Sequence, residues 1–399
     1  MTSTETMGST IDLFSDATLD NPYSVYAELR EFGPAVWMSA HELWAIPRYA
    51  AAREALGDWQ AFSSATGVGL NAQINTIAAG SVLISDPPLH DDLRRVLSSR
   101  LAPRSLKDLL TDMQQQADQL VRKVVSQGTF DAVADLAVAF PMSVVVDLIG
   151  FPEEASEHLM DWAEGVFNTF GPDNARMQEG FARTQEMYEY LAVSATRDRV
   201  KPGSFAATIY EAVDAGKIDA AGGLQLLAAY GSAGMDTTVN SISAAVALLA
   251  QHPDQWAALR ADPSLVNLAY EEVLRLESPV QGFGRSATRD YRFGDVTIPS
   301  GSQVFVLLGS ANRDGAHYPD PDRFDIHRRA LDHLAFGLGT HTCAGQGLAR
   351  MEARCVLTAL VNQVETLELS CTPTRRINNV VRGWQSVPVT VTTASAKGI

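Results

Sequence analysis

Apolar residues recur every three to four positions along most of the chain, the spacing that places them on one face of an α-helix. The pattern is most continuous between residues 105 and 250, where breaks fall at glycine and proline positions. Apart from a strand-like entry at residues 128–131, short β-prone runs lie early and late in the chain, and the last of them alternates and predicts a hairpin. They are 35–38, 43–46, 291–298, 302–308 and 378–392. The pattern therefore predicts a mainly α chain with little sheet.

One apolar stretch, residues 224–251, contains polar residues that its surroundings do not explain. Asp236 and Thr237 follow Gly234, although glycine costs about 0.5–1 kcal/mol relative to alanine inside a helix. Polar residues near the centre argue against a lipid-spanning helix and predict a buried one. Threonine hydroxyls can bond to a carbonyl one turn earlier and open a groove in the helix. We interpret the group as functional, with a polar kink in a core helix as the alternative.

The helical pattern is lost between residues 63 and 85, which are rich in glycine and small side chains. A loop of this length in a compact protein is typically functional or mobile. A helix is predicted after Asp86 and two prolines, and His90 and Arg94 lie one turn apart on its surface. Taken alone, this pair fits a solvated surface as well as a binding site.

Composition narrows the classes of protein to consider. With 399 residues and 46% apolar side chains, the chain can bury a large core, and it has no linker-like segment or internal repeat. We expect a flexible N-terminus over residues 1–20 and one domain over residues 21–399. The polar N-terminus predicts neither secretion nor a membrane anchor, and a net charge of −16 argues against nucleic acid as a partner. Three cysteines fit a reducing cytoplasm.

A glycine-spaced loop over residues 336–345 presents Cys343 just before a helical segment. Free backbone N–H groups and the helix dipole stabilise a thiolate there, and the glycines let a flat cofactor approach the backbone. Such a thiolate can be the axial ligand of a haem iron. The alternative for a single cysteine is a buried free thiol. Cys355 and Cys371 stand at no metal-binding spacing.

Glu272 and Arg275 stand three residues apart in a helical segment that is too apolar for a freely solvated pair. Arg323 follows in the segment Pro321–Phe324. We expect these three side chains to form a structural acid–base triad beside the cofactor.

The cysteine loop matches, at every fixed position, the Phe-Gly-x-Gly-x-His-x-Cys-x-Gly signature of the cytochrome P450 family, and practically the whole chain resembles that family. The resemblance implies a triangular helical prism with a small β-sheet region, haem b bound through Cys343, and proton delivery to dioxygen by Asp236 and Thr237. It also implies a separate 2Fe–2S-type ferredoxin and an NAD(P)H reductase as electron donors. By the same resemblance, the haem would contact His90, Arg94, Arg285, His341, Phe336 and Gly337.

Within the family, the chain is similar to monooxygenases that oxidise para-substituted benzoates and remove the methyl group of para-methoxybenzoate. Matching segments are 67–70, 167–172, 278–281 and 310–314. The resemblance implies a pocket that grips a flat ring by face and edge packing. Its walls would include Leu83, Phe167, Phe170, Ala233, Val280 and Phe283.

The chain departs from those enzymes where they bind the substrate carboxylate. Counted back from residue 86, their arginine and serine correspond to Ile77 and Gly80, and a second pair in the long helix corresponds to Ala228 and Ala229. A carboxylate buried against these residues would lose hydration without gaining a partner, at a cost of several kcal/mol. We therefore expect a neutral or phenolic aromatic substrate.

The sequence thus predicts a cytoplasmic haem-thiolate monooxygenase that inserts one oxygen atom of O2 into a small aromatic compound, with O-demethylation of a guaiacol-like methoxy-arene as the expected reaction. Tyr230 or Ser81 would hold a substrate hydroxyl. The alternatives are oxidation of a para-substituted benzoate, a non-catalytic haem-thiolate binder and a peroxide-driven enzyme, and the Asp236–Thr237 pair argues against the last two. Six basic residues form either a ferredoxin-docking face or scattered charge: Arg95, Arg100, Arg104, Lys107, Arg350 and Arg354.

Overall fold

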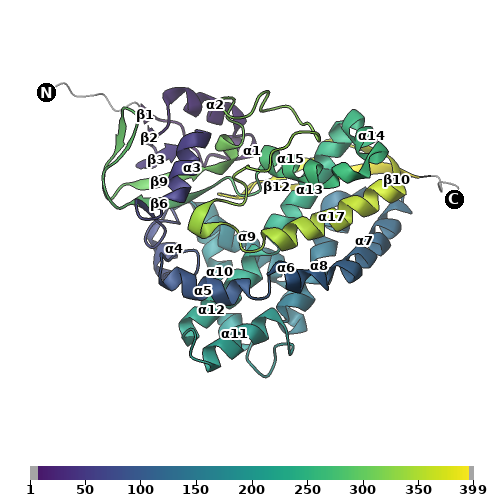
Figure 1. Cartoon of the computed structure of the whole chain (residues 1–399), viewed down its shortest axis with the longest axis horizontal. Helices are drawn as coiled ribbons and strands as arrows, with labels where there is room; N and C mark the ends of the chain where they lie inside the picture. Colours follow the sequence, from purple (N-terminus) through teal and green to yellow (C-terminus); the bar gives the residue numbers. More distant parts are fainter. Residues whose placement is uncertain (1–7, 395–399) are drawn as a thin grey trace.

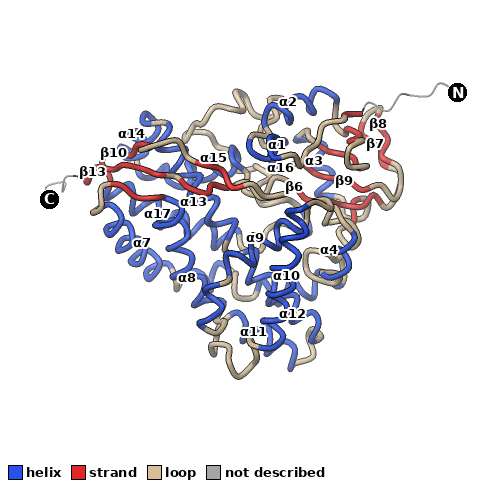
Figure 2. Tube along the Cα trace, turned by 180° about the vertical axis from the view of Figure 1, so that it is seen from behind, coloured by secondary structure: helices blue, strands red, loops and turns tan. Residues whose placement is uncertain are grey.

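The structure, a computed structural model, describes residues 8–394. Figure 1 shows a triangular outline with the strands in its upper part and α11 at the opposite tip. Figure 2 shows from behind that helices fill the space between the strands and that tip. Helices make up 52% of the chain, which confirms the prediction of a mainly α fold.

The helices are α1 (Asp16–Asp20), α2 (Tyr23–Phe32), α3 (Tyr49–Gly57), α4 (Ala72–Ile77), α5 (Leu89–Ser98), α6 (Pro103–Lys107), α7 (Leu110–Val125), α8 (Ala139–Ile149), α9 (Leu159–Thr169), α10 (Ala175–Val193), α11 (Phe205–Asp214), α12 (Ala220–Ala233), α13 (Asp236–Gln251), α14 (Pro253–Ala261), α15 (Val266–Glu277), α16 (Leu308–Ala311) and α17 (Gln346–Gln363). A π-helical stretch, Ala132–Val138, leads into α8, and short 3-10 turns span Glu153–Glu157, Pro263–Leu265 and Gly339–His341.

The strands are β1 (Gly8–Ser9), β2 (Val36–Met38), β3 (Leu43–Ile46), β4 (Phe62–Ser63), β5 (Thr129–Asp131), β6 (Gly282–Ala287), β7 (Tyr291–Phe293), β8 (Val296–Ile298), β9 (Gln303–Leu307), β10 (Val364–Leu369), β11 (Thr374–Arg376), β12 (Gly383–Ser386) and β13 (Pro388–Thr393). The largest sheet has the order β1-β2-β3-β9-β6-β4. In it, β6 pairs antiparallel with β9, so that Phe283 lies opposite Val306 and Arg285 opposite Val304. Because side chains alternate along a strand, Phe283 and Arg285 share one face of this sheet.

The hairpin predicted over residues 378–392 is wrong, because these residues belong to two sheets. β12 pairs with β11, whereas β13 pairs with β10 and β5. The chain changes sheets at Val387, whose carbonyl accepts a hydrogen bond from the backbone N–H of Ala132 at 2.8 Å. The β11–β12 pair instead packs on α13, where a side chain at Gly383 would collide with Asn240.

Secondary structure is present in two segments for which the sequence predicted none, the N-terminus and the loop over residues 63–85. Gly8–Ser9 pair with β2, and Ser15 caps α1 through its side chain, so the expected flexible N-terminus is wrong from residue 8 onward. Residues 1–7 lie outside the described residues. Asn71 caps α4 within the predicted loop in the same way. Helices this short carry no apolar period, and their caps are the only local signal.

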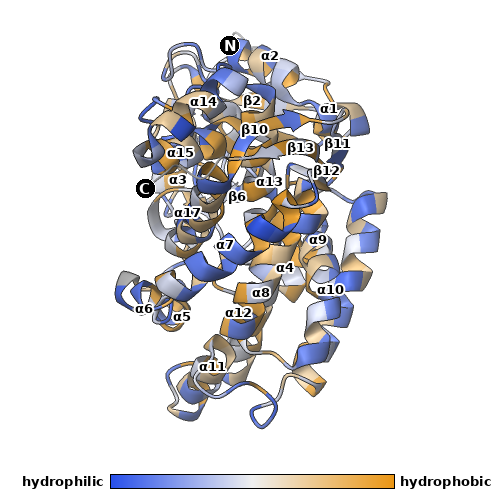
Figure 3. Cartoon of the chain, turned by 90° about the vertical axis from the view of Figure 1, so that its right-hand side faces the viewer, coloured by the Kyte–Doolittle hydropathy of each residue, from blue (hydrophilic) through white to orange (hydrophobic). Residues whose placement is uncertain are grey.

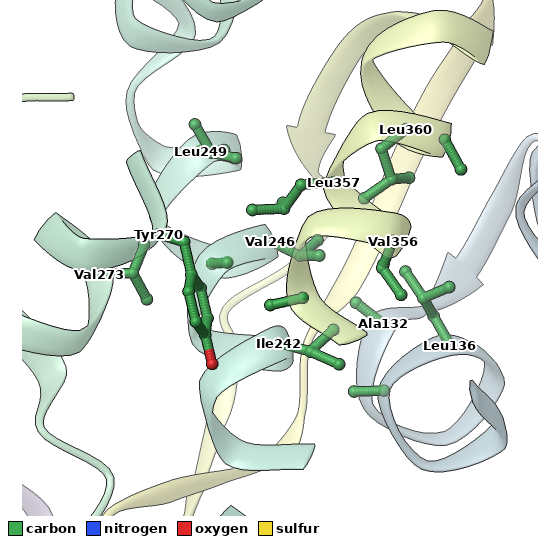
Figure 4. Close-up of a cluster of buried hydrophobic side chains, with 14 of the residues drawn as sticks. Ala132, Leu136, Ile242, Val246, Leu249, Tyr270, Val273, Val356, Leu357 and Leu360 are labelled. Atoms are coloured by element: carbon green, nitrogen blue, oxygen red, sulfur yellow. The ribbon is translucent and has the colours of Figure 1, made fainter. Parts of the chain in front are cut away.

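The core is built around α13, which is buried on every side. Its residues from Thr238 to Ala250 are at most 7% exposed. Figure 4 shows side chains of α13 packed between those of α15, α17 and the π-helical stretch that precedes α8. The labelled residues are Ala132, Leu136, Ile242, Val246, Leu249, Tyr270, Val273, Val356, Leu357 and Leu360.

One stretch, Ala132–Ile149, is long and apolar enough to cross a membrane by length and composition, and half of it is buried inside the protein. Leu136, Phe140 and Val144 from this stretch belong to the same core cluster as α13. Figure 3 shows hydrophobic residues where the helices face one another, whereas the peripheral helices α7 and α10 carry many hydrophilic residues.

The single helix predicted over residues 224–251 is two helices, α12 and α13, which meet at Gly234 and Met235. The hydroxyl of Thr237 donates to the carbonyl of Ala233 at 2.8 Å, which is the back-bonding that the sequence suggested. The regular helix is therefore interrupted at the polar group.

Glu272 and Arg275 form a fully buried ion pair through two hydrogen bonds of 2.7 and 2.9 Å. The third member of this network is Arg328, whose Nε lies 3.1 Å from Glu272 Oε1. The expectation for Arg323 is wrong. Its side chain is exposed because Phe324, the next residue, packs into the core, and only its backbone carbonyl faces Arg275.

A second acid of α15, Glu271, connects this helix to the cysteine loop and to α17. It accepts hydrogen bonds from His333 Nε2 at 2.9 Å and from Arg350 Nε at 2.6 Å. Burial acts to raise the pKa of Glu271, but the bonds from His333 and Arg350 outweigh it and lower the pKa to about 2. The Arg350 guanidinium also lies 4.5 Å from the ring centroid of Phe336. These contacts position the loop that carries Cys343.

We predict that Arg328→Ala lowers the free energy of unfolding by about 2–3 kcal/mol, because Glu272 stays buried with Arg275 as its remaining cation. Arg323→Ala should change it by less than about 0.5 kcal/mol, because that side chain is exposed. Urea unfolding followed by circular dichroism measures both. Equal effects of the two substitutions would contradict the assignment of Arg328 to the network.

Candidate functional site

A cavity of about 330 Å³ lies between α5, α9, α10, the α12–α13 junction, β6 and the cysteine loop. Its wall is mostly apolar. Among the residues singled out from the sequence that line it are Leu83, His90, Arg94, Phe167, Phe170, Ala229, Ala233, Thr237, Val280, Phe283, Arg285, Phe336, Gly337, His341 and Cys343. They come from six separate parts of the chain.

The cysteine loop owes its shape to two glycines and one hydrogen bond. Gly337 and Gly339 have φ values of +68° and +71°, a region that residues with a side chain rarely adopt. The backbone N–H of Cys343 donates to the carbonyl of Phe336 at 2.8 Å and closes the loop. Cys343 therefore stands two residues before Gly345, the N-cap of α17.

The surroundings of Cys343 balance burial against positive charge. Burial raises the pKa of the thiol, while the backbone N–H groups of Gly345 and Gln346 and the side chains of Arg94 and Arg350 act in the opposite direction. A metal cation beside the sulfur would complete the deprotonation, because a coordinating thiol loses its proton outright. The site is therefore suited to a metal-bound thiolate.

Four hydrogen-bond donors, His90, Arg94, Arg285 and His341, converge on the cavity, and we call them the donor cluster. The rings of His90 and His341 lie 4.6 Å apart, and their Nε2 atoms are buried without a hydrogen-bond partner among the described residues. Arg94 donates to the carbonyl of Thr342 at 2.6 Å. The two arginines carry positive charge toward an apolar cavity and therefore need an anion.

The pKa values of the donor cluster also indicate that it binds an anion. Burial lowers the pKa of Arg285 to about 10, against the attraction of Asp86. Burial and the nearby Arg285, His90 and Arg94 lower the pKa of His341 to about 3. Two carboxylates placed among these side chains would accept charge-assisted hydrogen bonds and satisfy both free imidazole nitrogens. Haem b carries two propionates, so the donor cluster would hold these groups and the thiolate of Cys343 would bind the iron.

Asp236 and Thr237 are neighbours in sequence but face different surroundings. Thr237 lines the cavity, whereas Asp236 is 0% exposed and does not. One carboxylate oxygen of Asp236 accepts a hydrogen bond from Arg376, and the other has no partner among the described residues. The pair can act together only if the Asp236 side chain turns.

Three phenylalanines line the cavity together. Phe170 lies 5.6 Å from Phe283 in an edge-to-face arrangement and 6.5 Å from Phe167. Leu83 and Val280 complete this wall. These spacings are those at which aromatic rings attract one another, so the group forms a preformed apolar cage.

The expectation that Ile77 lines the pocket is wrong. Its side chain is 41% exposed, and its carbonyl accepts a hydrogen bond from Gln225 of α12 at 3.2 Å. The short helix α4 turns Ile74 and Ala78 toward the cavity instead, because residues four apart share a helix face. Gly80 also lies outside the cavity wall.

The two hydroxyls suggested for substrate binding differ in availability. Tyr230 donates its hydroxyl proton to the carbonyl of Leu97 at 2.6 Å. Ser81 accepts a hydrogen bond from the backbone N–H of Ile84 at 3.1 Å, which leaves its own proton for another acceptor. Ser81 is therefore the better placed donor of the two.

Comparisons with known proteins agree with this site. The sequence pattern of the cytochrome P450 family matches residues 207–391. Cytochrome p450 CYP199A2 of Rhodopseudomonas palustris is 41% identical over 388 residues, which cover 96% of this chain and 94% of that protein. The structure of cytochrome P450 CYP109Q5 from Chondromyces apiculatus is 33% identical with a TM-score of 0.83, and the match covers 97% of this chain and 99% of that one.

The chain belongs to the cytochrome P450 family. Its cofactor is haem b, and its class is that of the haem-thiolate monooxygenases. A further structure, cytochrome P450 CREJ in complex with (4-ethylphenyl) dihydrogen phosphate, is 28% identical with a TM-score of 0.84, and the match covers 96% of this chain and 99% of that one.

Three charged residues of this P450 were missed from the sequence: Arg328, Glu352 and Arg376. Glu352 is 1% exposed, lines the cavity and has one carboxylate oxygen without a partner among the described residues. Burial raises its pKa to about 8, with a hydrogen bond from Thr238 acting in the opposite direction. A signal for Glu352 existed, because it stands four residues after Leu348 on the apolar face of the helix. For Arg328 and Arg376, the sequence contained no comparable signal.

We predict that Cys343→His binds haem but loses the red-shifted absorption band that the ferrous carbon monoxide complex of a thiolate-ligated haem shows. Turnover is lost with it, because imidazole donates less electron density to the iron than thiolate. Cys371→Ser is the matched control, because Cys371 is exposed, and it keeps the wild-type spectrum. A thiolate-type band in Cys343→His would contradict the assignment.

We predict that Glu352→Gln removes a loss of stability that the wild type shows as pH rises from 4.5 to about 8. The folded protein raises the pKa of Glu352, so between its ordinary value of 4.5 and about 8 the unfolded chain releases a proton that the folded chain keeps. The wild type therefore loses stability as pH rises through this range, by up to a few kcal/mol. Urea midpoints between pH 5 and pH 9 should fall less steeply in Glu352→Gln. Parallel slopes would show that Glu352 is ionised in the folded protein.

Proposed function

We propose that this P450 oxidises a small neutral or phenolic aromatic compound, and that O-demethylation of a methoxy-arene is its reaction. The observation that carries the proposal is the distribution of charge in the described cavity wall. Its arginines and histidines are the four members of the donor cluster, and its one carboxylate is Glu352. No charged side chain remains for the far end of a substrate.

The absence of charge in that part of the wall disfavours a benzoate. Ile74, Ala78, Ala228 and Ala229 line the cavity, and none of them can pair with a carboxylate. An anion placed there would be desolvated without a partner, which costs several kcal/mol. A phenol or a neutral ring pays no such penalty, and the hydroxyl of Ser81 offers one hydrogen bond.

The aromatic cage supports a flat substrate. Phe167, Phe170 and Phe283 offer faces and edges to a ring, and this packing restricts its orientation. A ring held in this way directs one substituent toward the Cys343 side of the cavity. Orientation of this kind raises the rate because the reacting carbon is held close to the oxidant.

When bound, haem supplies the activation of dioxygen that transfers one oxygen atom to a C–H bond. Oxygen insertion at a methoxy carbon gives a hemiacetal, which breaks its C–O bond to release formaldehyde and a phenol. The chain contributes the cage that excludes water, the thiolate of Cys343 and the hydroxyl of Thr237 at the cavity wall. Asp236 would supply protons through Thr237, and each turnover consumes two protons for the water that is formed.

We propose a separate 2Fe–2S-type ferredoxin with its NAD(P)H reductase as electron donors, and the cytoplasm as location. Free cysteines at positions 343, 355 and 371 are compatible with that compartment. Part of the basic face suggested for ferredoxin is already engaged, because Arg350 pairs with Glu271 and Arg95 with Asp92. The ligand of cytochrome P450 CREJ supports the aromatic part of the proposal by analogy alone, because that ligand is an aryl phosphate.

Spectral titration tests the proposal. We predict that neutral methoxyphenols convert the ferric haem to the high-spin form, that turnover with ferredoxin and NADH releases formaldehyde, and that para-methoxybenzoate has at least about 10²-fold lower affinity because its carboxylate is unpaired. Tight high-spin conversion by para-methoxybenzoate, with none by neutral phenols, would overturn the proposal.

A substitution in the same wall sharpens this titration. Ala228→Arg should raise the affinity for para-methoxybenzoate by on the order of tenfold or more and lower that for methoxyphenols, because it places a cation at the far end of the ring. Ala228→Met adds bulk without charge and is the matched control. If both variants respond alike, the size of the pocket and not its charge selects the substrate.

A further inference from the structure

Most polar side chains in the cavity wall cannot donate a hydrogen bond to a substrate, because they already donate to neighbouring oxygens. The hydroxyls that donate to backbone carbonyls are those of Thr184, Tyr230, Ser232, Thr237 and Ser241. Three more donate to side chains: Tyr188, Thr238 and Tyr270. Outside the donor cluster, the hydroxyl and amide groups of the described wall thus keep two uncommitted protons, one on Ser81 and one on Gln225.

Gln225 of α12 is held in one orientation by two neighbours. The hydroxyl of Tyr188, from α10, donates to its Oε1 at 2.7 Å, and its Nε2 donates to the carbonyl of Ile77, at the end of α4, at 3.2 Å. The reverse orientation would set Oε1 against the Ile77 carbonyl, and two acceptors cannot bond. Burial raises the pKa of Tyr188 to about 12, so it keeps the proton that it donates. A side-chain amide has two N–H donors, so one of them remains for a ligand.

Gln225 stands at one end of the wall that α12 contributes to the cavity. Five cavity-lining residues of this helix share one face: Gln225, Ala228, Ala229, Ser232 and Ala233. From Gln225 to Ala233 the helix rises by about 12 Å, at about 1.5 Å per residue. The carbonyl of Ala233 accepts the hydrogen bond of Thr237, the residue beside which oxygen transfer is proposed to occur. The free amide N–H therefore lies at the end of this wall away from the reaction.

The length of this wall and the chemistry of its end restrict the ligand. A benzene ring with a single methoxy group is shorter than the wall, so with its methoxy carbon near Ala233 it leaves the Gln225 end unfilled. An N–H donor there suits an oxygen that accepts a hydrogen bond and has no proton of its own, such as a carbonyl oxygen. Gln225 carries no charge, so it cannot offset the desolvation of a carboxylate.

We propose that Gln225, oriented by Tyr188, is a polar subsite that binds a neutral carbonyl group on a side chain of the aromatic substrate. This inference rests on the proposed function and narrows its substrate class. The preferred substrate is a methoxy-arene whose side chain stands para to the methoxy group and carries a ketone, aldehyde or amide. The aromatic cage then holds the ring, and Gln225 fixes the far end of the molecule.

Spectral titration of the ferric holoenzyme with two matched ligands tests the subsite. Both are methoxybenzenes with a para side chain, an oxobutyl chain in one and a methylbutyl chain in the other, so that a methyl group replaces the ketone oxygen. The ratio of their dissociation constants is the quantity measured, because changes in access or ring packing affect both ligands alike. We expect Gln225→Leu to reduce the preference for the ketone by about three- to tenfold, the effect of losing one neutral hydrogen bond.

Three further variants separate the amide N–H from the shape of the side chain. Gln225→Glu keeps the length of the side chain but replaces the donor with an acceptor, so it should reduce the preference at least as much as Gln225→Leu. Tyr188→Phe removes the bond that orients the amide and should reduce the preference by a smaller factor. Gln185→Leu on α10 is the matched control, because Gln185 is exposed and bonds to Glu189 at 2.8 Å, and it should keep the wild-type ratio.

The outcomes separate this inference from a structural role and from the proposed function. If Gln225 only ties α4 to α12, its substitution changes both dissociation constants by the same factor, so wild-type ratios in Gln225→Leu and Gln225→Glu would overturn the subsite. If neither variant folds with haem, a wild-type ratio in Tyr188→Phe has the same consequence. Failure of the wild type to release formaldehyde from either ligand would overturn the proposed reaction but leave the subsite standing, because the affinity ratio does not depend on turnover.

Discussion

Two buried imidazole nitrogens without partners, beside two arginines that face an apolar cavity, are the constraint on which the rest of the site depends. Such a group is unfavourable by itself, because each unpaired polar atom costs desolvation free energy. Two carboxylates of a bound cofactor remove that cost. The donors come from α5, β6 and the cysteine loop, so haem binding would connect three distant segments of the chain.

The proximal side of the site depends on a second set of buried charges. Glu272 and Arg275 join α15 to the segment that carries Arg328, and Glu271 joins it to the cysteine loop and α17. These ion pairs add little net stability, because desolvation offsets most of the attraction between buried charges. Their main role is to hold the segments in place. Their effect is to fix the loop geometry that presents Cys343 to the cavity.

Sequence reasoning located the residues whose chemistry depends on near neighbours in the chain. Cys343 stands in a loop whose glycines and following helix explain its role, and Thr237 follows a glycine in an apolar helix. It failed where a partner comes from a distant segment. Arg376 reaches Asp236 across 140 residues of sequence, and it does so from β11, a short strand that the sequence did not predict.

Ile77 was misplaced for a different reason. A short capped helix rotates its side chain outward, and counting residues across a predicted loop cannot detect that rotation. The expectation of a neutral or phenolic substrate, which rested partly on Ile77, still has support. The residues Ile74, Ala78, Ala228 and Ala229 in the cavity wall are uncharged. The cations of the cavity wall therefore all belong to the donor cluster, and the aromatic cage is apolar.

The most direct test of this account compares the binding of haem b and of its dimethyl ester to the apoprotein. The ester keeps the iron and the ring but has no propionate charge, so the donor cluster gains no anion from it. We predict that the apoprotein binds the ester at least about 10²-fold more weakly than haem b, and that the difference shrinks in Arg285→Met. Equal affinity for the two would contradict the account, because His90, Arg94, Arg285 and His341 would then have no role in holding the cofactor.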